Sequence, residues 1–183
     1  MVAARRPSTA RAFAVYAVLS LLPVLALGAV LVRSDQTEAR HRGLSEAKAQ
    51  AALVAHAAVE PLLDGHPLSS GLTPAEQASL ARLSRRSIGG DILRLRLRGL
   101  DGAVVYSDDG SGFGGTIEDE VLDAAQGKAI TLLTRLNADA NDRGPVGQPA
   151  VEAYRPVYAG ATPHRVGVLE VYLPYAPIKN EAG

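Results

Sequence analysis

The chain has 183 residues, and its 19 lysines and arginines balance its 19 aspartates and glutamates. This neutral charge, together with the absence of tryptophan and an aromatic content of 4%, argues against a surface for nucleic acid, which needs positive charge and stacking platforms. The absence of cysteine excludes disulfides, thiol catalysis and iron–sulfur clusters.

The first element predicted along the chain is a transmembrane helix at residues 12–32. This run carries no charged residue and is long enough to span a bilayer once. Residues 1–11 contain three arginines and no acidic residue, so the positive-inside rule places them in the cytoplasm and the rest of the chain outside. A cleaved signal peptide is the alternative, because Ala26-Leu27-Gly28 offers a small-x-small cleavage site. We expect the uncleaved anchor, since the apolar run is longer than the usual signal-peptide core.

Residues 33–63 predict a long juxtamembrane stalk helix. Its apolar residues recur at steps of three and four, which is typical of a helix with one apolar stripe: Leu44, Ala47, Ala51, Val54, Ala58 and Leu62. Pro61 and the turn-forming residues 64–67 are expected to end this helix. The small side chains suit packing against the sheet of the same chain, or a parallel coiled coil between two protomers. We expect sheet packing in the outer half of the helix and homodimer contacts near the membrane.

A second helix and a β-hairpin follow. Thr73 and Glu76 form a capping box for a helix at residues 74–87. The pattern then changes to a period of two, because leucines alternate with arginines over residues 93–98. This alternation is typical of a strand with one apolar and one charged face. Asp101-Gly102 signals a tight turn into a partner strand.

The remaining sequence predicts a short helix and three more strands. The helix is expected to begin at Thr116, with Asp119 as its capping-box partner, and to end near Gly127. The five predicted strands occupy residues 93–98, 103–107, 129–136, 151–158 and 165–175. Because no crossover helix separates the later strands, we expect antiparallel pairing. The predicted fold class is therefore α+β, with the stalk helix packed on a five-stranded antiparallel sheet.

Two local patterns are candidates for a cofactor site and a metal site. The segment Gly110–Gly115 matches G-x-G-x-x-G between a strand and a helix, the context of a dinucleotide-binding fingerprint. Asp108-Asp109 would place acids beside a pyrophosphate, however, and no second βαβ half follows, so we interpret the segment as a flexible turn. His56, Asp64 and His66 do not have the spacing of a zinc site, and a solvated or capping role is favoured. We expect no metal and no cofactor.

The sequence offers no catalytic constellation. Nothing pairs a nucleophile with a base, and no G-x-S-x-G pattern occurs. We interpret Asp108-Asp109 and Glu118-Asp119-Glu120 as loop and helix-start charges instead of a catalytic dyad. No catalytic residue is predicted, and an exported enzyme is the least favoured class of function.

The charged face of the first strand, formed by Arg94, Arg96 and Arg98, has two interpretations. The favoured one is a cross-strand charge ladder with Glu152 and Glu170 on other strands of the sheet. The other is recognition of an anion, because arginine presents a planar fork to carboxylate or phosphate. In that second interpretation, neighbouring strands contribute further lining residues: Tyr106, Tyr154 and Arg155.

Three segments of the chain resemble the extracytoplasmic Cache-type (PAS-like) sensor domains of bacterial receptors. They are LDGAVVYSD at residues 100–108, VEAYRPV at residues 151–157 and GVLEVYLPY at residues 167–175. More narrowly, the whole chain resembles the N-terminal region of actinobacterial membrane-bound GGDEF–EAL proteins, which make or degrade cyclic di-GMP. The same sensor architecture also precedes histidine kinases and chemoreceptors.

This resemblance implies a Cache-like sensor domain at residues 64–178, with residues 179–183 leading towards a second transmembrane helix. It implies a signal-input module in the bacterial inner membrane whose stalk helix passes a ligand-induced shift to a cytoplasmic output. None of the catalytic residues of GGDEF or EAL domains lies in this sequence. The alternatives are the sensor of a histidine kinase, or a stand-alone, single-pass anchored domain that binds a partner protein.

The resemblance also implies where a ligand would bind. Cache domains hold a small extracytoplasmic ligand between the sheet and the long helix, on the membrane-distal side. An anionic ligand at that place would favour the following residues: Arg94 or Arg96, with Tyr106, Tyr154 and Arg155.

Overall fold

The computed structural model describes residue 16, residues 21–23, residues 25 and 38, and residues 40–175. The chain divides into two compact units, Met1–His41 and Arg42–Gly183. In the described part of the chain, no helix is long and apolar enough to cross a membrane. The predicted transmembrane helix at residues 12–32 falls almost wholly outside the described residues, so it stays a prediction.

The first helix of the second unit is assembled from small residues. In this unit, residues 42–53 are α-helical, and the helix continues through a π-helical turn, η1 (Val54–Val59), and a 3-10 turn, η2 (Glu60–Leu62). Its buried positions lie at four-residue steps and belong to the main apolar core: Ala47, Ala51, Ala55 and Val59. Helical geometry ends at Leu63, whose backbone is extended. The predicted packing of the outer stalk on the sheet of its own chain is confirmed.

A second helix packs beside the first. After a 3-10 turn, η3 (Leu68–Ser70), helix α2 (Pro74–Ser87) begins with the predicted capping box. The backbone N–H of Glu76 donates to Thr73 Oγ1 at 3.3 Å, and the backbone N–H of Thr73 donates to Glu76 Oε2 at 2.8 Å. Helix α2 buries Leu80 in the main core.

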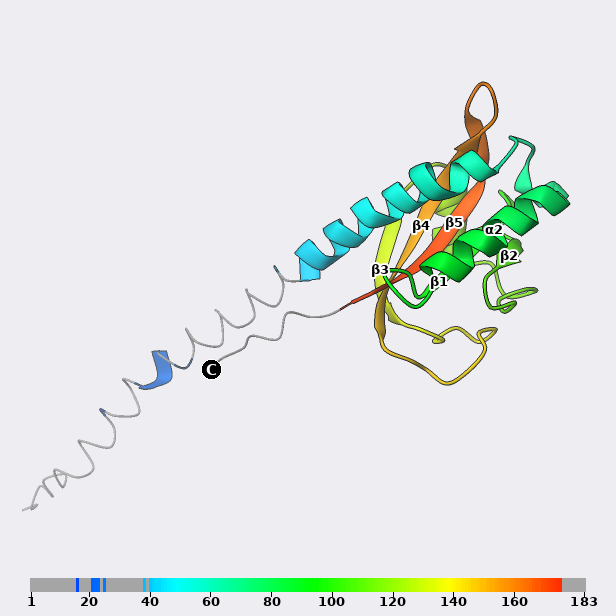
Figure 1. Ribbon diagram of the computed structural model, residues 1–183. Helices are drawn as coiled ribbons and strands as arrows, with labels where there is room; N and C mark the ends of the chain where they lie inside the picture. The colour runs from blue at the N-terminus through cyan, green and yellow to red at the C-terminus, as the bar shows by residue number, and fades with distance from the viewer. Residues whose placement is uncertain (1–15, 17–20, 24, 26–37, 39, 176–183) are drawn as a thin grey trace, which may run out of the picture. The chain divides into compact units, whose positions relative to one another are not determined.

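The sheet has five antiparallel strands in the order β2-β1-β5-β4-β3 (Figure 1). The strands are β1 (Arg94–Arg98), β2 (Val104–Ser107), β3 (Ile130–Arg135), β4 (Pro149–Ala159) and β5 (His164–Pro174). All five predicted strands are confirmed, with ends that differ by one or two residues. The α+β class and the antiparallel sheet are confirmed as well.

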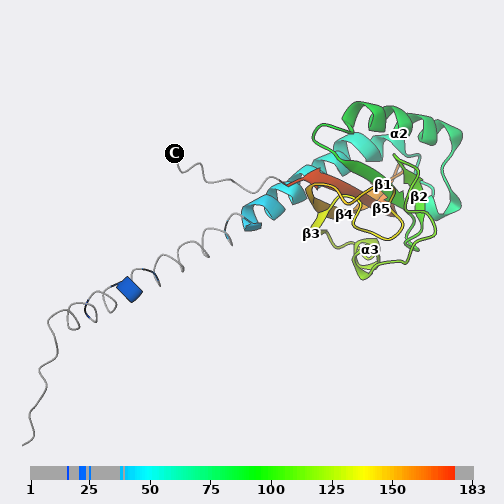
Figure 2. The same ribbon diagram turned by 90° about the horizontal axis from the view of Figure 1, so that it is seen from below.

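One face of the sheet carries the apolar core. The first helix and α2 lie on this side, and α3 lies on the other (Figure 2). Leu95 and Leu97 of β1 and Leu169 and Val171 of β5 are fully buried in this core. Burial of each such side chain stabilises the fold by roughly 1.5–3 kcal/mol. The helix face of the sheet is therefore its firmly packed side.

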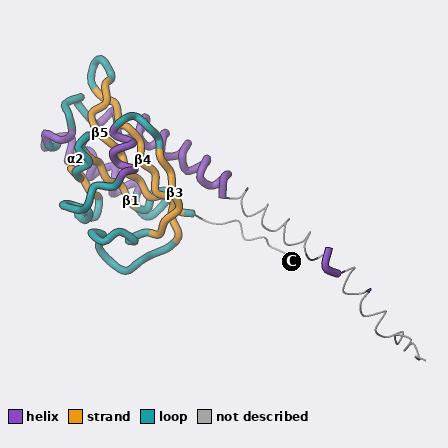
Figure 3. The backbone as a smooth tube through the Cα atoms, turned by 180° about the vertical axis from the view of Figure 1, so that it is seen from behind, coloured by secondary structure: helices purple, strands orange, loops and turns teal. Residues whose placement is uncertain are grey.

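The other face is covered by helix α3 (Asp119–Ala125) and by loops, drawn in teal in Figure 3. Val121 and Ala124 of α3 pack against Tyr154 and Val168 in a second, smaller cluster. The prediction that this helix starts at Thr116 with a side-chain cap is wrong. The helix is capped by Glu118 without a side-chain hydrogen bond, because the Glu118 carboxylate accepts a hydrogen bond from the Tyr154 hydroxyl instead.

Candidate functional site

The candidate site begins with three buried arginines. Strand alternation gives Leu95 and Leu97 to the helix side of the sheet, so Arg94, Arg96 and Arg98 point to the loop-covered side. There, they are only 4%, 1% and 7% exposed. Because a buried guanidinium needs charged or hydrogen-bonded partners, each arginine must find them on this face.

Glu170 of β5 supplies the first of these partners. It lies directly opposite Arg96 in the β1–β5 register and is fully buried. Arg96 Nη1 donates to Glu170 Oε1 at 3.0 Å, and Arg98 Nε donates to Glu170 Oε2. The predicted cross-strand ladder is confirmed for Glu170 and is wrong for Glu152, which accepts hydrogen bonds from tyrosines and forms no ion pair with an arginine among the described residues.

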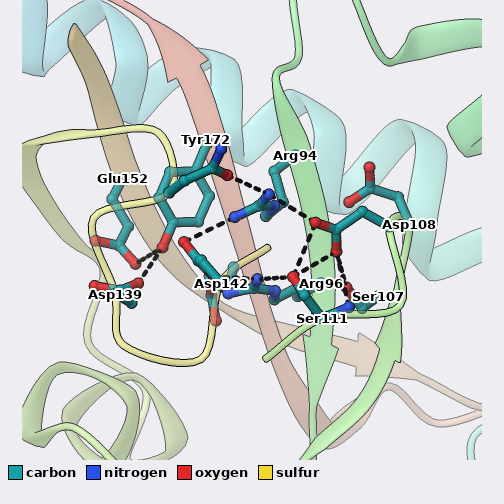
Figure 4. A network of polar contacts seen from close by, with 12 residues as sticks. Arg94, Arg96, Ser107, Asp108, Ser111, Asp139, Asp142, Glu152 and Tyr172 are labelled. Atoms are coloured by element: carbon teal, nitrogen blue, oxygen red, sulfur yellow. Dashed lines mark hydrogen bonds and ion pairs between the residues drawn. The ribbon is translucent and has the colours of Figure 1, made fainter. Parts of the chain in front are cut away.

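Two loops supply the remaining partners from above the sheet (Figure 4). From loop 136–148, Asp142 reaches Arg96 Nη2 at 2.5 Å and lies 2.8 Å from Arg94 Nη1, the second contact being an ion pair without hydrogen-bond angles. From loop 108–118, Asp109 accepts from Arg94 Nη2 at 2.7 Å, and Ser111 Oγ accepts from Arg96 Nη2 at 2.8 Å. Both loops are thus held to β1 through charged contacts.

The glycine-rich segment has a structural task at this point. Gly112 has a φ of +83°, and a Cβ atom there would lie 2.8 Å from Cζ of Arg96. Only glycine allows this backbone conformation and this close approach without strain. The G-x-G-x-x-G spacing therefore serves the packing of a loop on a guanidinium, in agreement with its interpretation as a turn.

The charges of this cluster stabilise one another. Burial alone lowers the pKa of Arg96, but Glu170 and Asp142 outweigh burial, and the net shift is upward. Burial raises the pKa of Asp109, but hydrogen bonds from Ser111 and Ser107 and the charge of Arg94 bring it down to about 2. Both shifts favour the charged forms of Arg96 and Asp109.

A second polar cluster lies beside the arginines, around two tyrosines. Tyr154 Oη lies 2.6 Å from Glu152 Oε1 and 2.6 Å from Glu118 Oε2. Tyr172 Oη lies 2.7 Å from the same Glu152 oxygen and 2.8 Å from Asp139 Oδ2. Burial raises the pKa of Glu152 to about 8, although both tyrosine hydroxyls favour its charged form. This cluster joins the sheet to loop 136–148 and to the start of α3.

A cavity of about 280 Å³ opens between the sheet and this cover. Its charged lining consists of two arginines and three carboxylates: Arg96, Arg98, Glu118, Asp139 and Asp142. The uncharged residues of the wall are Gly112, Gly115, Thr116, Ala138, Ala140 and Asn141. The cavity has the size and polarity to hold one small polar molecule.

The structure brings some of the predicted ligand-binding residues together and separates the others. Arg94, Arg96 and Tyr154 share the loop-covered face. Tyr106 lies in the core on the helix side, where its hydroxyl lies 2.8 Å from Ser84 Oγ. Arg155 also faces the helix side, in the wall of a different hollow. Between the sheet and the long helix, which is the place that the resemblance implied, the buried residues form a packed apolar core, and the hollow beside Arg155 opens at its edge.

Several residues of this site were not predicted: Glu118, Asp139, Asp142 and Tyr172. The alternation of polar residues in β4 and β5 was a usable signal, because Glu152, Tyr154, Glu170 and Tyr172 all fall on the face that carries the arginines. No comparable signal marked Asp139 or Asp142, since both lie in a long irregular loop whose path depends on tertiary contacts.

A separate cluster, Asp64, His66 and Glu76, brings three potential metal ligands within 4.8 Å. His66 Nδ1 contacts Asp64 Oδ1, and His66 Nε2 lies 2.7 Å from the carbonyl oxygen of Gly71. Both ring nitrogens thus face acceptors, which favours the imidazolium, a form that has no lone pair for a metal. The hydrogen bond to Gly71 and the contact with Asp64 raise the pKa of His66 accordingly. The cluster stabilises the turn between the first helix and α2 through charged contacts.

Comparison of the sequence with protein-family models gives no match, and comparison with curated proteins gives none. The fold and the site themselves define the protein as an α+β domain with a charged, loop-covered cavity on one face of its sheet. The resemblance to Cache-type sensors rests on the sequence segments alone.

Proposed function

We propose that this chain is the extracytoplasmic sensor module of a bacterial signal-transduction receptor, and that the cavity under loops 108–118 and 136–148 binds its ligand. The observation that carries the proposal is the attachment of these loops by side-chain charges to a sheet whose opposite face holds the long helix. A small polar ligand in the cavity competes for the same arginines and carboxylates, so its binding changes the packing of the cover.

The route from the cavity to the helix runs through the sheet, because β1 lines the cavity and β4 contacts the end of the helix at η1 and η2. Arg96 contacts the cavity cover, whereas its neighbours Leu95 and Leu97 belong to the apolar core on the helix side. A ligand that favours one position of Arg96 therefore favours one position of β1 in the sheet and against this core. Such a ligand shifts the balance between two packings by its difference in affinity for them.

The membrane placement and the output complete the proposal. Residues 12–32 would anchor the chain in the inner membrane with the N-terminus in the cytoplasm, as their composition favours. The resemblance supports a cytoplasmic output of the cyclic di-GMP type, with a histidine kinase as the alternative. An anionic ligand fits the three arginines, but each guanidinium already contacts a carboxylate, so the ligand must displace one of these.

The test is a thermal-unfolding screen of the full 183-residue chain, in which unfolding is monitored by circular dichroism. The probes are small carboxylates, amino acids, amines and sugars, one at a time. A ligand should raise Tm, because it binds the folded state only. The variant Ala140→Phe, which fills the cavity wall, should abolish this shift, and Ala57→Phe on the exposed side of the first helix should keep it. A shift that survives in Ala140→Phe would place the ligand elsewhere, and the absence of any shift would count against small-molecule sensing.

A second candidate function, an anchored protein-interaction domain, is favoured by a different surface. A hollow of about 970 Å³ lies between the first helix and the β4–β5 hairpin. Its rim includes Leu53 and Tyr158, which are 66% and 40% exposed. A photo-crosslinking residue at Leu53 should give a discrete adduct in cells if this surface binds a partner, and the same residue at Ala57, outside the hollow, should not. Equal labelling at both positions would indicate random collision.

A further inference from the structure

The two tyrosines of the candidate site link three carboxyl groups into one chain of oxygen contacts. In order, the chain runs Glu118, Tyr154, Glu152, Tyr172, Asp139, with four O···O distances of 2.6, 2.6, 2.7 and 2.8 Å. Glu152 stands at the centre and uses a single oxygen, Oε1, for both tyrosines. Figure 4 shows the half of the chain that runs from Glu152 through Tyr172 to Asp139.

These five side chains have too few hydrogens to place one in each of the four oxygen–oxygen contacts. Each contact at such a distance requires one hydrogen between the two oxygens, and a tyrosine hydroxyl supplies one. Tyr154 and Tyr172 keep their hydrogens, because burial and the neighbouring carboxylates raise the pKa of both hydroxyls. With all three carboxyl groups ionised, two of the four contacts would bring oxygen lone pairs together in a buried place. An additional proton relieves this repulsion.

The position of that proton decides which way the tyrosines donate. A neutral Glu152 supplies a third hydrogen, which Oε1 donates to one tyrosine, and both tyrosines can then donate outward, Tyr154 to Glu118 and Tyr172 to Asp139; only the contact between Oε1 and the other tyrosine is left without a hydrogen. An ionised Glu152 accepts from both tyrosines, and Glu118 and Asp139 lose their donors. These two outer carboxylates belong to the cavity cover, since Asp139 lies in loop 136–148 and Glu118 caps α3.

We propose that Glu152 is a proton-binding site that controls the cover of the cavity. Protonated Glu152 closes the cover by turning both tyrosine hydroxyls towards it, and ionised Glu152 loosens the cover by withdrawing them. The device deepens the proposed sensor function, on which its physiological purpose rests, by making the proton a second input to the same cavity.

The surroundings of Glu152 favour this behaviour at mildly alkaline pH. The titratable groups that face it are Tyr154 on its own strand, Glu170 and Tyr172 on β5, and Asp139 on loop 136–148. Its partner in β3 is Leu132, which carries no charge. The arginines on this face are held by Glu170, Asp142 and Asp109. Burial is the largest cause of the upward shift of the Glu152 pKa, to about 8.

The proposal can be tested without any ligand by measuring the distance between two spin labels with double electron–electron resonance. Because the chain has no cysteine, Arg143→Cys in loop 136–148 and Ala57→Cys on the exposed side of the first helix provide unique label sites. In the full chain, the distance distribution should broaden roughly twofold between about pH 6 and about pH 9.5, as a loosened loop samples more positions. An unchanged distribution over this range would overturn the proposal.

Three further substitutions in the labelled chain identify the group responsible. Glu152→Gln should keep the distribution narrow at both pH values, because an amide nitrogen at the place of Oε1 donates two hydrogens, one to each tyrosine. Tyr172→Phe should make it broad already at about pH 6, since Asp139 then lacks its donor. The control is Glu46→Gln, which replaces an exposed carboxylate on the first helix; its distance distribution should respond to pH as that of the unsubstituted chain does.

A pH response that persists in Glu152→Gln would assign the titration to another group and overturn the proposal. If Glu152→Gln does not fold, Tyr172→Phe still decides the matter, because a narrow distribution in that variant would contradict the role of the tyrosine. Failure of the ligand screen leaves these distances unaffected, and failure of the pH response leaves the screen unaffected, so the two proposals fail separately.

Discussion

Glu170 is the residue on which the buried charges of the site depend. Its two oxygens serve Arg96 and Arg98 separately, and it is fully buried. Replacing such a pair with apolar residues is often harmless, whereas removing one partner leaves an uncompensated buried charge. We therefore expect Glu170→Gln to lower the free energy of unfolding by about 3–5 kcal/mol in urea unfolding followed by circular dichroism. The exposed Glu46→Gln should change it by less than about 0.5 kcal/mol. Equal effects of the two would show that Glu170 is solvated.

Gly112 permits a direct separation of backbone strain from steric contact. Gly112 and Gly114 both have positive φ, but only at Gly112 would a Cβ atom meet the guanidinium of Arg96. Alanine at either position costs about 1 kcal/mol for the backbone. Gly112→Ala should cost a further 1–3 kcal/mol or so for the displaced arginine, measured by the same unfolding experiment. If Gly114→Ala is equally destabilising, the contact with Arg96 does not limit the loop.

His66 gives the turn before α2 a defined pH dependence. Its pKa is raised above the ordinary value of 6.5 by the hydrogen bond to Gly71 and by Asp64. A histidine with a raised folded pKa stabilises the fold fully below the unfolded pKa, and this contribution disappears as the pH rises through the folded value. His66→Gln should therefore lower Tm by a few degrees at about pH 5.5 and by less at about pH 8.5. A constant difference would show that the imidazolium charge plays no part.

At the scale of elements, local sequence patterns predicted the helices and strands correctly, but they did not predict the start of α3 or the loop contacts that cover one face of the sheet. The leucine–arginine alternation of β1 and the Thr73–Glu76 box act within a few residues, so both appear in the structure as expected. The predicted start of α3 was wrong because Glu118 accepts a hydrogen bond from Tyr154, which lies 36 residues further along the sequence. The Asp142 contacts with β1 were out of reach for the same reason. The arginine face could thus be predicted, whereas the loop carboxylates that complete the site could not.

The first helix depends on the smallness of its inner face. Ala51 is fully buried against the sheet, in a row with Ala47 and Ala55. A larger side chain there has to push the helix away from the strands. We expect Ala51→Leu to lower the free energy of unfolding by about 1–3 kcal/mol, as overpacking does. Ala57→Leu, on the exposed side of the same helix, should be neutral or slightly stabilising through helix propensity. Tolerance of Ala51→Leu would indicate that the helix packs loosely on the sheet.

At the scale of the whole described domain, the sheet separates two kinds of cohesion. Its helix face is held by apolar burial, which is insensitive to pH and to small polar molecules. Its loop face is held by ion pairs and by tyrosine–carboxyl contacts, for which a small polar molecule can compete. Every strand carries residues of both faces. In the proposed sensor, a change on the loop face would therefore reach the helix through the strands, without any need for the core to open.

The last prediction concerns the partner of the first helix. An input module that signals along a helix needs a second surface for this helix to move against, and we expect a second copy of the chain to provide it. Ala49 and Leu53 are exposed, lie four residues apart on the helix and line its hollow beside the β4–β5 hairpin, where a second helix can make contact. Sedimentation velocity of the full chain in non-ionic detergent should show a dimer.

Substitution within that contact decides between the two candidate functions. Leu53→Glu should shift the sedimenting species to the monomer, because a carboxylate in an apolar helix–helix contact has no partner. Ala57→Glu, which is exposed but lies outside the hollow, should remain dimeric. A wild-type chain that sediments as a monomer, yet is crosslinked from Leu53 to another protein in cells, would favour the anchored interaction domain. A dimer broken by Leu53→Glu would favour the sensor, since the same helix then meets the sheet on one side and its own copy on the other.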